Sequence, residues 1–325
     1  MNAVVIIDKP SGLTSHDVVA RARRILGERS IGHLGTLDPM ATGVLPLVVG
    51  SLTRLAQFYT HSEKTYEGSI RFGFSTDTYD AEGEPTSTPQ AVTLDPIHLH
   101  ALAARFRGFI EQTPPPFSAK KIHGVPAYKL ARKKKEVILK PVQVEIKEFE
   151  ILSIESDRAS FRARVASGTY MRSVAHELGQ LLACGAHLES LRRTSVAEFT
   201  LADAHTLETV EASFTTKKTN NKNCHSEHAH SAGEEPAFIA AIPVDSLFIH
   251  PRKLLPDLPS VTADETTAAH IRTGRPVNLP DFSRARQVKV FYGQRELIAI
   301  ATRVAGTLFH PKIVLTGSET PVSVS

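Results

Sequence analysis

The segment with the clearest chemical potential is a glycine-punctuated loop over residues 32–46, which reads GHLGTLDPMATGVLP. Glycine permits backbone conformations that other residues avoid and lets a ligand approach the chain closely. Pro39 favours an extended conformation at Asp38, which can project its carboxylate from the loop. The segment lacks the lysine and hydroxyl residue that end a phosphate-binding P-loop. Because an aspartate before a proline is most often part of a turn, the loop alone leaves a turn and a catalytic carboxylate both open.

A second group of chemically capable side chains lies in the polar tract over residues 213–237. This tract contains few apolar residues and cannot bury enough surface to offset the entropy of ordering, so we expect a disordered insertion. Cysteine and histidine in one short tract raise the alternative of a metal site. No second ligand group at fixed spacing accompanies them, so we expect no metal; the residues concerned are Cys224, His225, His228 and His230.

The elements around the loop can be predicted from local patterns. Val4–Ile7 is typical of a short buried strand, and Thr14 or Ser15 can cap a helix whose apolar positions recur at helical spacing up to Gly27. Val44–Val49 is a second buried strand. The loop with Asp38 therefore connects this helix to a buried strand.

Most of the remaining elements before residue 213 are strands. Residues 64–73 alternate between apolar and polar side chains, as do the runs near 142–146 and 161–165. Helical spacing occurs near 97–107, 173–183 and 200–212. Strands outnumber regular βαβ units, so we predict an α+β fold with a mixed, mainly antiparallel sheet and helices packed on it.

Changes in residue composition and pattern along the chain predict its domains. We expect one domain over residues 1–212, the insertion over 213–237, a connecting segment over 238–255 and a small β-rich domain over 256–325. A short helix near 263–272 and three strand-like runs support the last of these, whose length is within the usual range.

Composition narrows the class of protein. The chain has 325 residues, a formal charge of +4 and a pI near 9.0, which favour a polyanionic partner only weakly. Two cysteines in no paired pattern argue against a disulfide framework. No segment resembles a signal peptide or a membrane-spanning helix. We expect a soluble, cytoplasmic protein.

The loop over residues 32–46 resembles, along its whole length, the signature of the TruB family of tRNA pseudouridine synthases, which form pseudouridine at position 55 of the T loop. The match is residue by residue, so it is highly specific. Further segments resemble other motifs of the family in the same order. These are Asp8–Gly12, Lys64–Tyr66, Thr76–Gly83, Gly168–Arg172 and Gly185–Thr194. They span residues 8–194, well over half the chain, and imply the pseudouridine synthase fold.

The resemblance implies a role for each motif residue. Asp38 is the catalytic aspartate that attacks the base or the sugar of the target nucleotide. Arg172 pairs with Asp38 and keeps it ionised, and Asp80 orients Arg172. Tyr66 stacks on the flipped uracil or is a core tyrosine. Tyr170 is also implied at the active site: in an extended segment it would point the same way as Arg172, and the alternative is a core tyrosine. Leu191 would form an apolar wall. Lys9 would either support the loop or bind phosphate.

Other residues are implied in RNA binding. A uridine in a folded loop must turn out to reach the carboxylate, and His33 helps to extrude it or ties down its own loop. Basic pairs are expected to contact phosphate, namely Lys120 and Lys121, and Arg192 and Arg193. The terminal domain resembles the small PUA-type RNA-binding module of the family. The sequence departs from the family at Ala197, where glycine is common, and in the tract over residues 213–237.

The resemblance also implies partners. We expect a monomer that modifies the T arm of tRNA and uses no metal and no organic cofactor. An alternative is the guide-RNA-dependent branch of the superfamily, and the early position of Asp8–Pro10 favours the stand-alone type. A second alternative is a tRNA-folding chaperone with vestigial catalysis. The presence of Asp38, Tyr66 and Arg172 together argues against lost catalysis.

Overall fold

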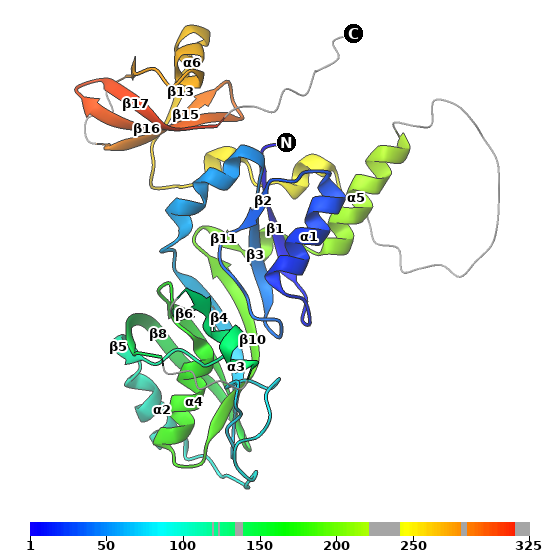
Figure 1. Cartoon of the computed structure of the whole chain (residues 1–325), viewed down its shortest axis with the longest axis vertical. Coiled ribbons are helices and arrows are strands. Elements are labelled where there is room, and N and C mark those ends of the chain that lie inside the picture. Colours follow the sequence, from blue (N-terminus) through cyan, green and yellow to red (C-terminus); the bar gives the residue numbers. More distant parts are fainter. Residues whose placement is uncertain (119, 123, 134–138, 221–240, 281–284, 316–325) are drawn as a thin grey trace, which may run out of the picture. The chain divides into compact units, whose positions relative to one another are not determined.

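The structure is a computed structural model that describes residues 1–315, except residues 119, 123, 134–138, 221–240 and 281–284 (Figure 1). The chain forms two compact units. The first comprises Met1–Asp38, Val44–Thr60 and Glu198–Ser325, and the second comprises Pro39–Gly43 and His61–Ala197. We describe each unit by itself.

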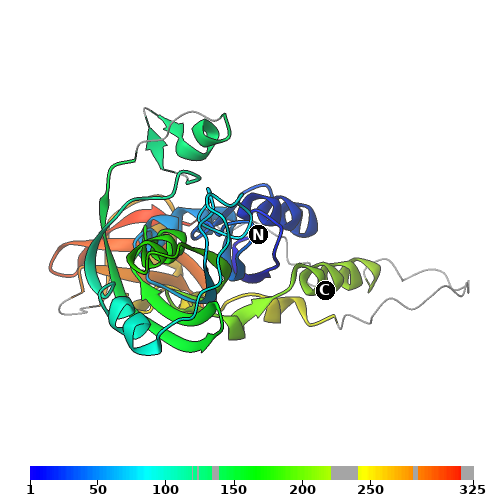
Figure 2. The same ribbon diagram turned by 90° about the horizontal axis from the view of Figure 1, so that it is seen from below.

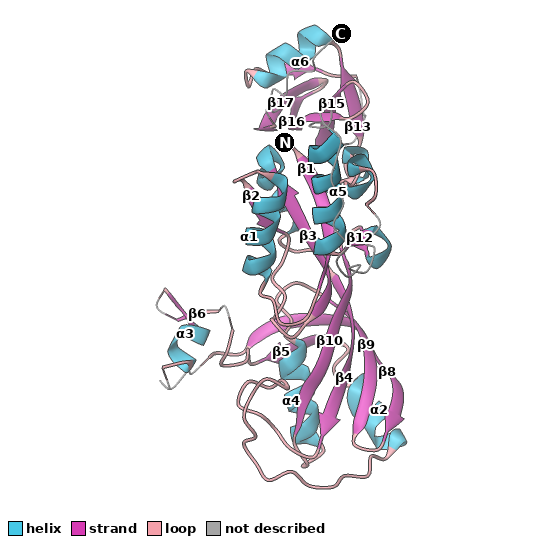
Figure 3. Cartoon of the chain, turned by 90° about the vertical axis from the view of Figure 1, so that its right-hand side faces the viewer, coloured by secondary structure: helices cyan, strands magenta, loops and turns pink. Residues whose placement is uncertain are grey.

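The first unit begins with strand β1 (Ala3–Lys9), helix α1 (Ser15–Leu26), β2 (Ile31–His33), β3 (Thr42–Val49) and the 3₁₀-helix η1 (Gly50–Tyr59). Thr14 caps α1 through a reciprocal capping box with Asp17, and Gly27 ends the helix in the left-handed conformation, as predicted. Strand β1 lies between β3 and the short parallel strand β12 (Ala204–His205). Helix α5 (Leu207–Asn220) packs beside α1 (Figure 3), where Arg21 donates to Glu208 at 2.8 Å and to Glu211 at 2.7 Å.

The first unit ends in a separate sheet, ordered β13-β15-β16-β17-β14. Helix α6 packs on it through Ala268 and Ile271, against a core that includes Val290 and Phe309. The predicted β-rich C-terminal region is therefore present. Its elements are β13 (Ser260–Ala263), α6 (Glu265–Arg272), β14 (Val277–Asn278), β15 (Gln287–Tyr292), β16 (Glu296–Ala305) and β17 (Leu308–Val314).

Buried polar groups attach this sheet to the preceding segment. The Lys289 ammonium, almost fully buried, donates to the carbonyls of Arg252 and Leu254 at 3.1 and 2.7 Å. The backbone N–H of Leu255 donates to the Glu198 carboxylate at 2.9 Å, and the Tyr59 hydroxyl donates to the same carboxylate oxygen at 2.6 Å. Burial and the Glu198 charge raise the pKa of Tyr59, so this hydroxyl remains a donor.

The second unit is an antiparallel sheet ordered β10-β4-β9-β8-β5. Along β4, Tyr66, Ile70 and Phe72 are buried, as the alternation predicted. Helix α4 (Met171–Leu181) packs against β10. The strands are β4 (Lys64–Phe72), β5 (Gly108–Gln112), β8 (Val142–Glu155), β9 (Arg158–Val165) and β10 (Ala186–Val196), and the other helix against the sheet is α2 (Pro96–Ala104).

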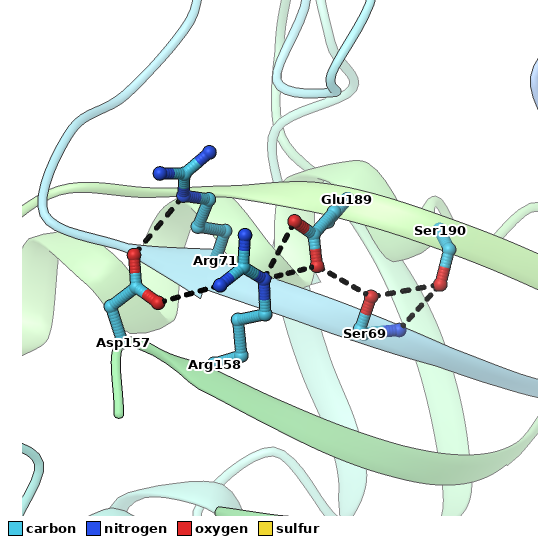
Figure 4. A network of polar contacts seen from close by, with 6 residues as sticks. All are labelled: Ser69, Arg71, Asp157, Arg158, Glu189 and Ser190. Atoms are coloured by element: carbon cyan, nitrogen blue, oxygen red, sulfur yellow. Dashed lines mark hydrogen bonds and ion pairs between the residues drawn. The ribbon is translucent and has the colours of Figure 1, made fainter. Parts of the chain in front are cut away.

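Ion pairs connect charged side chains on this sheet and on the turn between β8 and β9. Figure 4 shows one network, in which Arg158 donates to Glu189 at 2.8 Å and to Asp157 at 3.0 Å. Arg71 donates to Asp157 at 3.1 Å, and the Ser69 hydroxyl donates to Glu189 at 3.1 Å. Because carboxylates already neutralise these arginines, this part of the sheet is a poor surface for phosphate.

Three boundaries differ from the sequence prediction. Helix α4 begins at Met171, so Arg172 lies in its first turn rather than in an extended segment. The helix expected near 200–212 is replaced by a 3₁₀-turn, η2 (Leu201–Asp203), followed by β12 and α5. Helix α5 continues over residues 213–220, the start of the expected insertion, because Ser213 is buried and bonds to Ile242 at 3.0 Å. Residues 221–237 lie outside the described residues.

Ala197 has a left-handed backbone, with φ of 50°. This conformation costs a non-glycine residue about 1–2 kcal/mol, and the freedom that glycine adds to the unfolded chain costs about 0.4–1 kcal/mol. Ala197→Gly should therefore raise the free energy of unfolding by about 0.5–1 kcal/mol, measured by urea titration. Ala101→Gly, at an exposed helical position, should lower it by about 1 kcal/mol. Equal losses in both variants would contradict strain at Ala197.

Candidate active site

The loop with Asp38 is fixed at both ends by hydrogen bonds. His33 pairs with Leu47 across β2 and β3, and the Leu34 N–H donates to the carbonyl of Pro46 at 2.9 Å. The buried Ser15 hydroxyl accepts from the Leu37 N–H at 2.8 Å and donates to the Leu37 carbonyl at 3.2 Å. The residue before Asp38 is thus held by the first residue of α1. Asp38 itself is partly exposed.

Ser15 is a support of the loop with Asp38 that sequence reasoning missed. The sequence indicated a helix cap at Thr14 or Ser15, and the structure gives the cap to Thr14. The Ser15 hydroxyl is therefore available to bond to Leu37 in the loop with Asp38. No local pattern signals a contact between residues that are 22 positions apart.

Lys9 supports the chain between β1 and α1. Its side chain is fully buried, and the ammonium donates to the carbonyls of Pro10 and Leu13 at 2.8 and 2.6 Å. A buried ammonium that bonds to backbone carbonyls favours loop support over phosphate binding, the two alternatives that the sequence left open.

The start of β3 lies against β10 in the second unit. Thr42 and Gly43 pair in parallel with Arg192 and Arg193. Gly43 has φ of 99°, and a Cβ there would lie 2.2 Å from the carbonyl oxygen of Arg193, so only glycine fits. The Arg192 guanidinium is partly exposed and donates to the Thr42 hydroxyl at 3.4 Å. The Arg193 side chain is fully buried, which corrects its expected role as a surface phosphate contact.

Tyr66 lies on β4 and Leu191 lies on β10, two adjacent strands of the sheet. Tyr66 is 7% exposed and Leu191 is 8% exposed. Lys64 lies two residues before Tyr66 and therefore on the same face of β4. Burial and the nearby Arg193 charge lower the pKa of Lys64 to about 8, so its ammonium gives up its proton more readily than that of an ordinary lysine.

Asp80 and Arg172 form a buried ion pair, as expected from the sequence. Arg172 Nη1 lies 3.3 Å from Asp80 Oδ2, and both side chains are about 95% buried, with exposures of 6% and 5%. The other carboxylate oxygen, Oδ1, accepts from the Thr78 hydroxyl at 2.6 Å and from the Glu82 N–H at 3.1 Å. Arg172 also donates to the carbonyls of Thr78 and Phe117, at 3.3 and 3.1 Å. The guanidinium is thus oriented by three acceptors.

An aromatic stack that the sequence did not reveal packs beside this pair. The Tyr79 ring lies 3.8 Å from the His176 ring, centroid to centroid, and the two planes differ by 9°. Tyr79 has a left-handed backbone, with φ of 66°, and precedes Asp80, while His176 lies one helical turn after Arg172. Burial lowers the pKa of His176, which favours the neutral ring. The stack fixes the turn with Asp80 on α4.

Basic residues gather on a small arm of the second unit. Strands β6 (Lys121–Ile122) and β7 (Val125–Pro126) form a hairpin, and helix α3 (Ala127–Ala131) follows. Figures 2 and 3 both show these elements standing away from the sheet. Lys120 is exposed just before the hairpin, and Arg132 lies over the Tyr128 ring at 5.6 Å. The arm therefore carries several exposed cations.

The described residues contain neither a cluster that could hold a metal ion nor a helix that could cross a membrane. No set of three or more histidine, cysteine, aspartate or glutamate side chains in this part of the chain could hold a metal ion. No helix within it combines the length and apolar character that crossing a membrane requires. His225, His228, His230 and Cys224 lie outside the described residues.

Comparison with known proteins gives a consistent result. The sequence model described as TruB family pseudouridylate synthase (N terminal domain) matches residues 23–171, and the one described as tRNA pseudouridylate synthase B C-terminal domain matches residues 172–229. The tRNA pseudouridine synthase B of Solibacter usitatus is 46% identical over 318 residues, which cover 97% of this chain and 100% of that protein. The protein of the same name from Aquifex aeolicus is 37% identical over 317 residues, again 97% and 100% of the two chains.

Solved structures resemble the chain in fold. A chain in the crystal structure of a Cbf5-Nop10-Gar1 complex aligns with a TM-score of 0.68 at 23% identity, over 97% of this chain and 85% of that one. A chain in an H/ACA RNP bound to a substrate RNA containing 2′-deoxyuridine aligns with a TM-score of 0.67, also at 23% identity and with the same coverage. At this identity the likeness shows the fold alone.

Proposed function

The chain belongs to the TruB family of pseudouridylate synthases, and on that premise we propose that it converts uridine-55 in the T loop of tRNA into pseudouridine. The enzyme is then an isomerase, because the base leaves the ribose through N1 and returns through C5. The N1–C1′ bond breaks, a C5–C1′ bond forms, and the C5 proton is released while N1 gains one. No atom is added from outside, so we propose that the reaction uses no metal and no organic cofactor.

The buried pair of Asp80 and Arg172 is the observation that carries this proposal. A guanidinium held by Asp80 and two backbone carbonyls has a fixed position and direction. We assign to Arg172 the task of keeping the Asp38 carboxylate ionised, since a nearby cation favours the charged form. An ionised Asp38 can attack the target nucleotide and later leave it.

Other residues would bind the flipped nucleotide. Tyr66 supplies a ring for stacking on uracil, which contributes about 1–3 kcal/mol per base, and Leu191 supplies an apolar wall. Tyr170 lines the site at the start of α4. His33, at the end of β2, occupies the space that the extruded base leaves, which offsets part of the few kcal/mol that flipping costs.

We assign the RNA contacts to lysine and arginine side chains. Lys120 and Lys121 on the arm and Arg192 on β10 would bind phosphates, and the C-terminal sheet would bind as a PUA-like module. Phosphate contacts supply most of the affinity of such complexes. The protein would act as a monomer on the T arm of tRNA, in the cytoplasm where the tRNA is found.

Release of tritium from uracil C5 tests this function. The purified protein is incubated with an unmodified tRNA transcript labelled with tritium at uracil C5, and label in water is counted. We expect close to one equivalent per tRNA, and none from a transcript with cytidine at position 55. Binding of the tRNA without release of tritium would indicate an RNA-binding protein that lacks this activity. Release only after addition of a guide RNA would assign the chain to the guide-dependent branch.

A further inference from the structure

The segment over residues 112–117, which leads into the arm of β6, β7 and α3, is attached to the first turn of α4. Gln112, at the end of β5, exchanges two hydrogen bonds with the backbone of Tyr170. The Ser173 hydroxyl donates to the carbonyl of Thr113 at 2.8 Å, and Arg172 donates to the carbonyl of Phe117 at 3.1 Å. Polar contacts at three residues, 112, 113 and 117, therefore join this segment to the turn that carries Arg172.

The contact of Gln112 is the most specific of the three. Its Oε1 accepts from the Tyr170 N–H at 2.8 Å, and its Nε2 donates to the Tyr170 carbonyl at 3.2 Å. The Gln112 side chain is fully buried. Both ends of the amide are thus used on one residue, a geometry that fixes the position of the Tyr170 backbone.

Helix α4 lacks a cap of its own. Tyr170 is its N-cap residue and makes no side-chain capping bond. In a capping box, a Glu or Gln at the third helical position bonds back to the N–H of the N-cap residue. That third position here is Ser173, whose hydroxyl bonds to Thr113 instead. Gln112 supplies the missing bond from another strand.

We propose that Gln112 is a positioning residue, which sets the first turn of α4 and through it the guanidinium of Arg172. This inference rests on the proposed function only for its catalytic consequence. Arg172 is two residues from Tyr170, and its guanidinium lies 3.3 Å from Asp80 with both side chains almost fully buried. A small shift of the turn therefore changes the direction of the guanidinium. Misplacement of a catalytic group by about 1 Å can lower turnover by about 10²-fold.

The test compares two substitutions of Gln112. Gln112→Met keeps the volume and removes both hydrogen bonds, and we expect kcat to fall about 10–100-fold while the Kd for tRNA changes less than about 2-fold, since phosphate contacts set it. Gln112→Glu can restore both bonds when its carboxyl group is protonated, because the O–H then donates and the other oxygen accepts. Because position 112 is fully buried, the pKa of a carboxyl group there is raised. The kcat of Gln112→Glu relative to wild type should therefore rise as the pH is lowered from 8.5 to 6, while the ratio for Gln112→Met stays flat.

A matched control is Gln143→Met, which removes an exposed glutamine from the neighbouring strand β8 and should leave kcat unchanged. Hydrogen–deuterium exchange of the peptide over residues 168–176 supplies a readout independent of catalysis. Exchange should be faster in Gln112→Met than in wild type, whether or not the wild type releases tritium. Unchanged exchange, or a kcat ratio for Gln112→Glu that is as flat with pH as that of Gln112→Met, would overturn the proposal.

Discussion

Replacing Asp38 by alanine is expected to abolish pseudouridine formation while tRNA binding survives. Loss of a nucleophile lowers turnover by about 10⁴-fold or more, because the remaining groups only bind and orient the substrate. The residues proposed above to contact phosphate are other side chains, so the Kd should change less than about 3-fold. Tritium release at saturating enzyme measures the first quantity and filter binding measures the second.

Asp38→Asn is the sharper variant, since it keeps the size of the side chain and removes its charge. Equal loss in both variants would assign the effect to the nucleophile rather than to packing in the loop. Ser15→Ala serves as the loop control, because it removes the two bonds to Leu37 and leaves the carboxylate in place. Residual turnover in Asp38→Ala together with collapsed tRNA binding would make Asp38 a structural residue.

Local patterns predicted most of the elements because their causes are local. The capping box of α1, its glycine stop and the alternation along β4 each depend on residues within a few positions of one another. The start of α4 was misplaced for the opposite reason. Its N-cap is Tyr170, a poor capping residue, and the bond that satisfies its N–H comes from Gln112, 58 positions earlier.

The same distinction between local and long-range causes applies to the residues of the candidate site. The pairing of Asp80 with Arg172 was expected only through the family resemblance, and the structure confirms it. The stack of Tyr79 on His176 could not be expected, because neither residue belongs to a pattern that predicts contact. Arg193 was misjudged because sequence cannot show that a strand buries one of two adjacent arginines. Long-range contacts decide these cases.

Asp80→Asn should reduce both stability and turnover. The asparagine can keep its oxygen toward the Thr78 hydroxyl and the Glu82 N–H, which leaves its amide NH₂ facing Arg172. Two donors then oppose each other, and a buried guanidinium loses its counter-charge. Breaking one side of a buried pair costs about 3–5 kcal/mol, and we expect a loss near 3 kcal/mol by urea titration, since Arg172 keeps two carbonyl acceptors.

The matched control is Glu67→Gln, which breaks the exposed pair between Glu67 and Arg162 in the same sheet. Exposed pairs contribute about 0–1 kcal/mol, so this variant should retain its stability and its kcat. For Asp80→Asn we expect kcat to fall about 10²-fold even at temperatures where the variant is fully folded. If stability fell and kcat did not, the pair would hold the turn on α4 without directing Arg172 in catalysis.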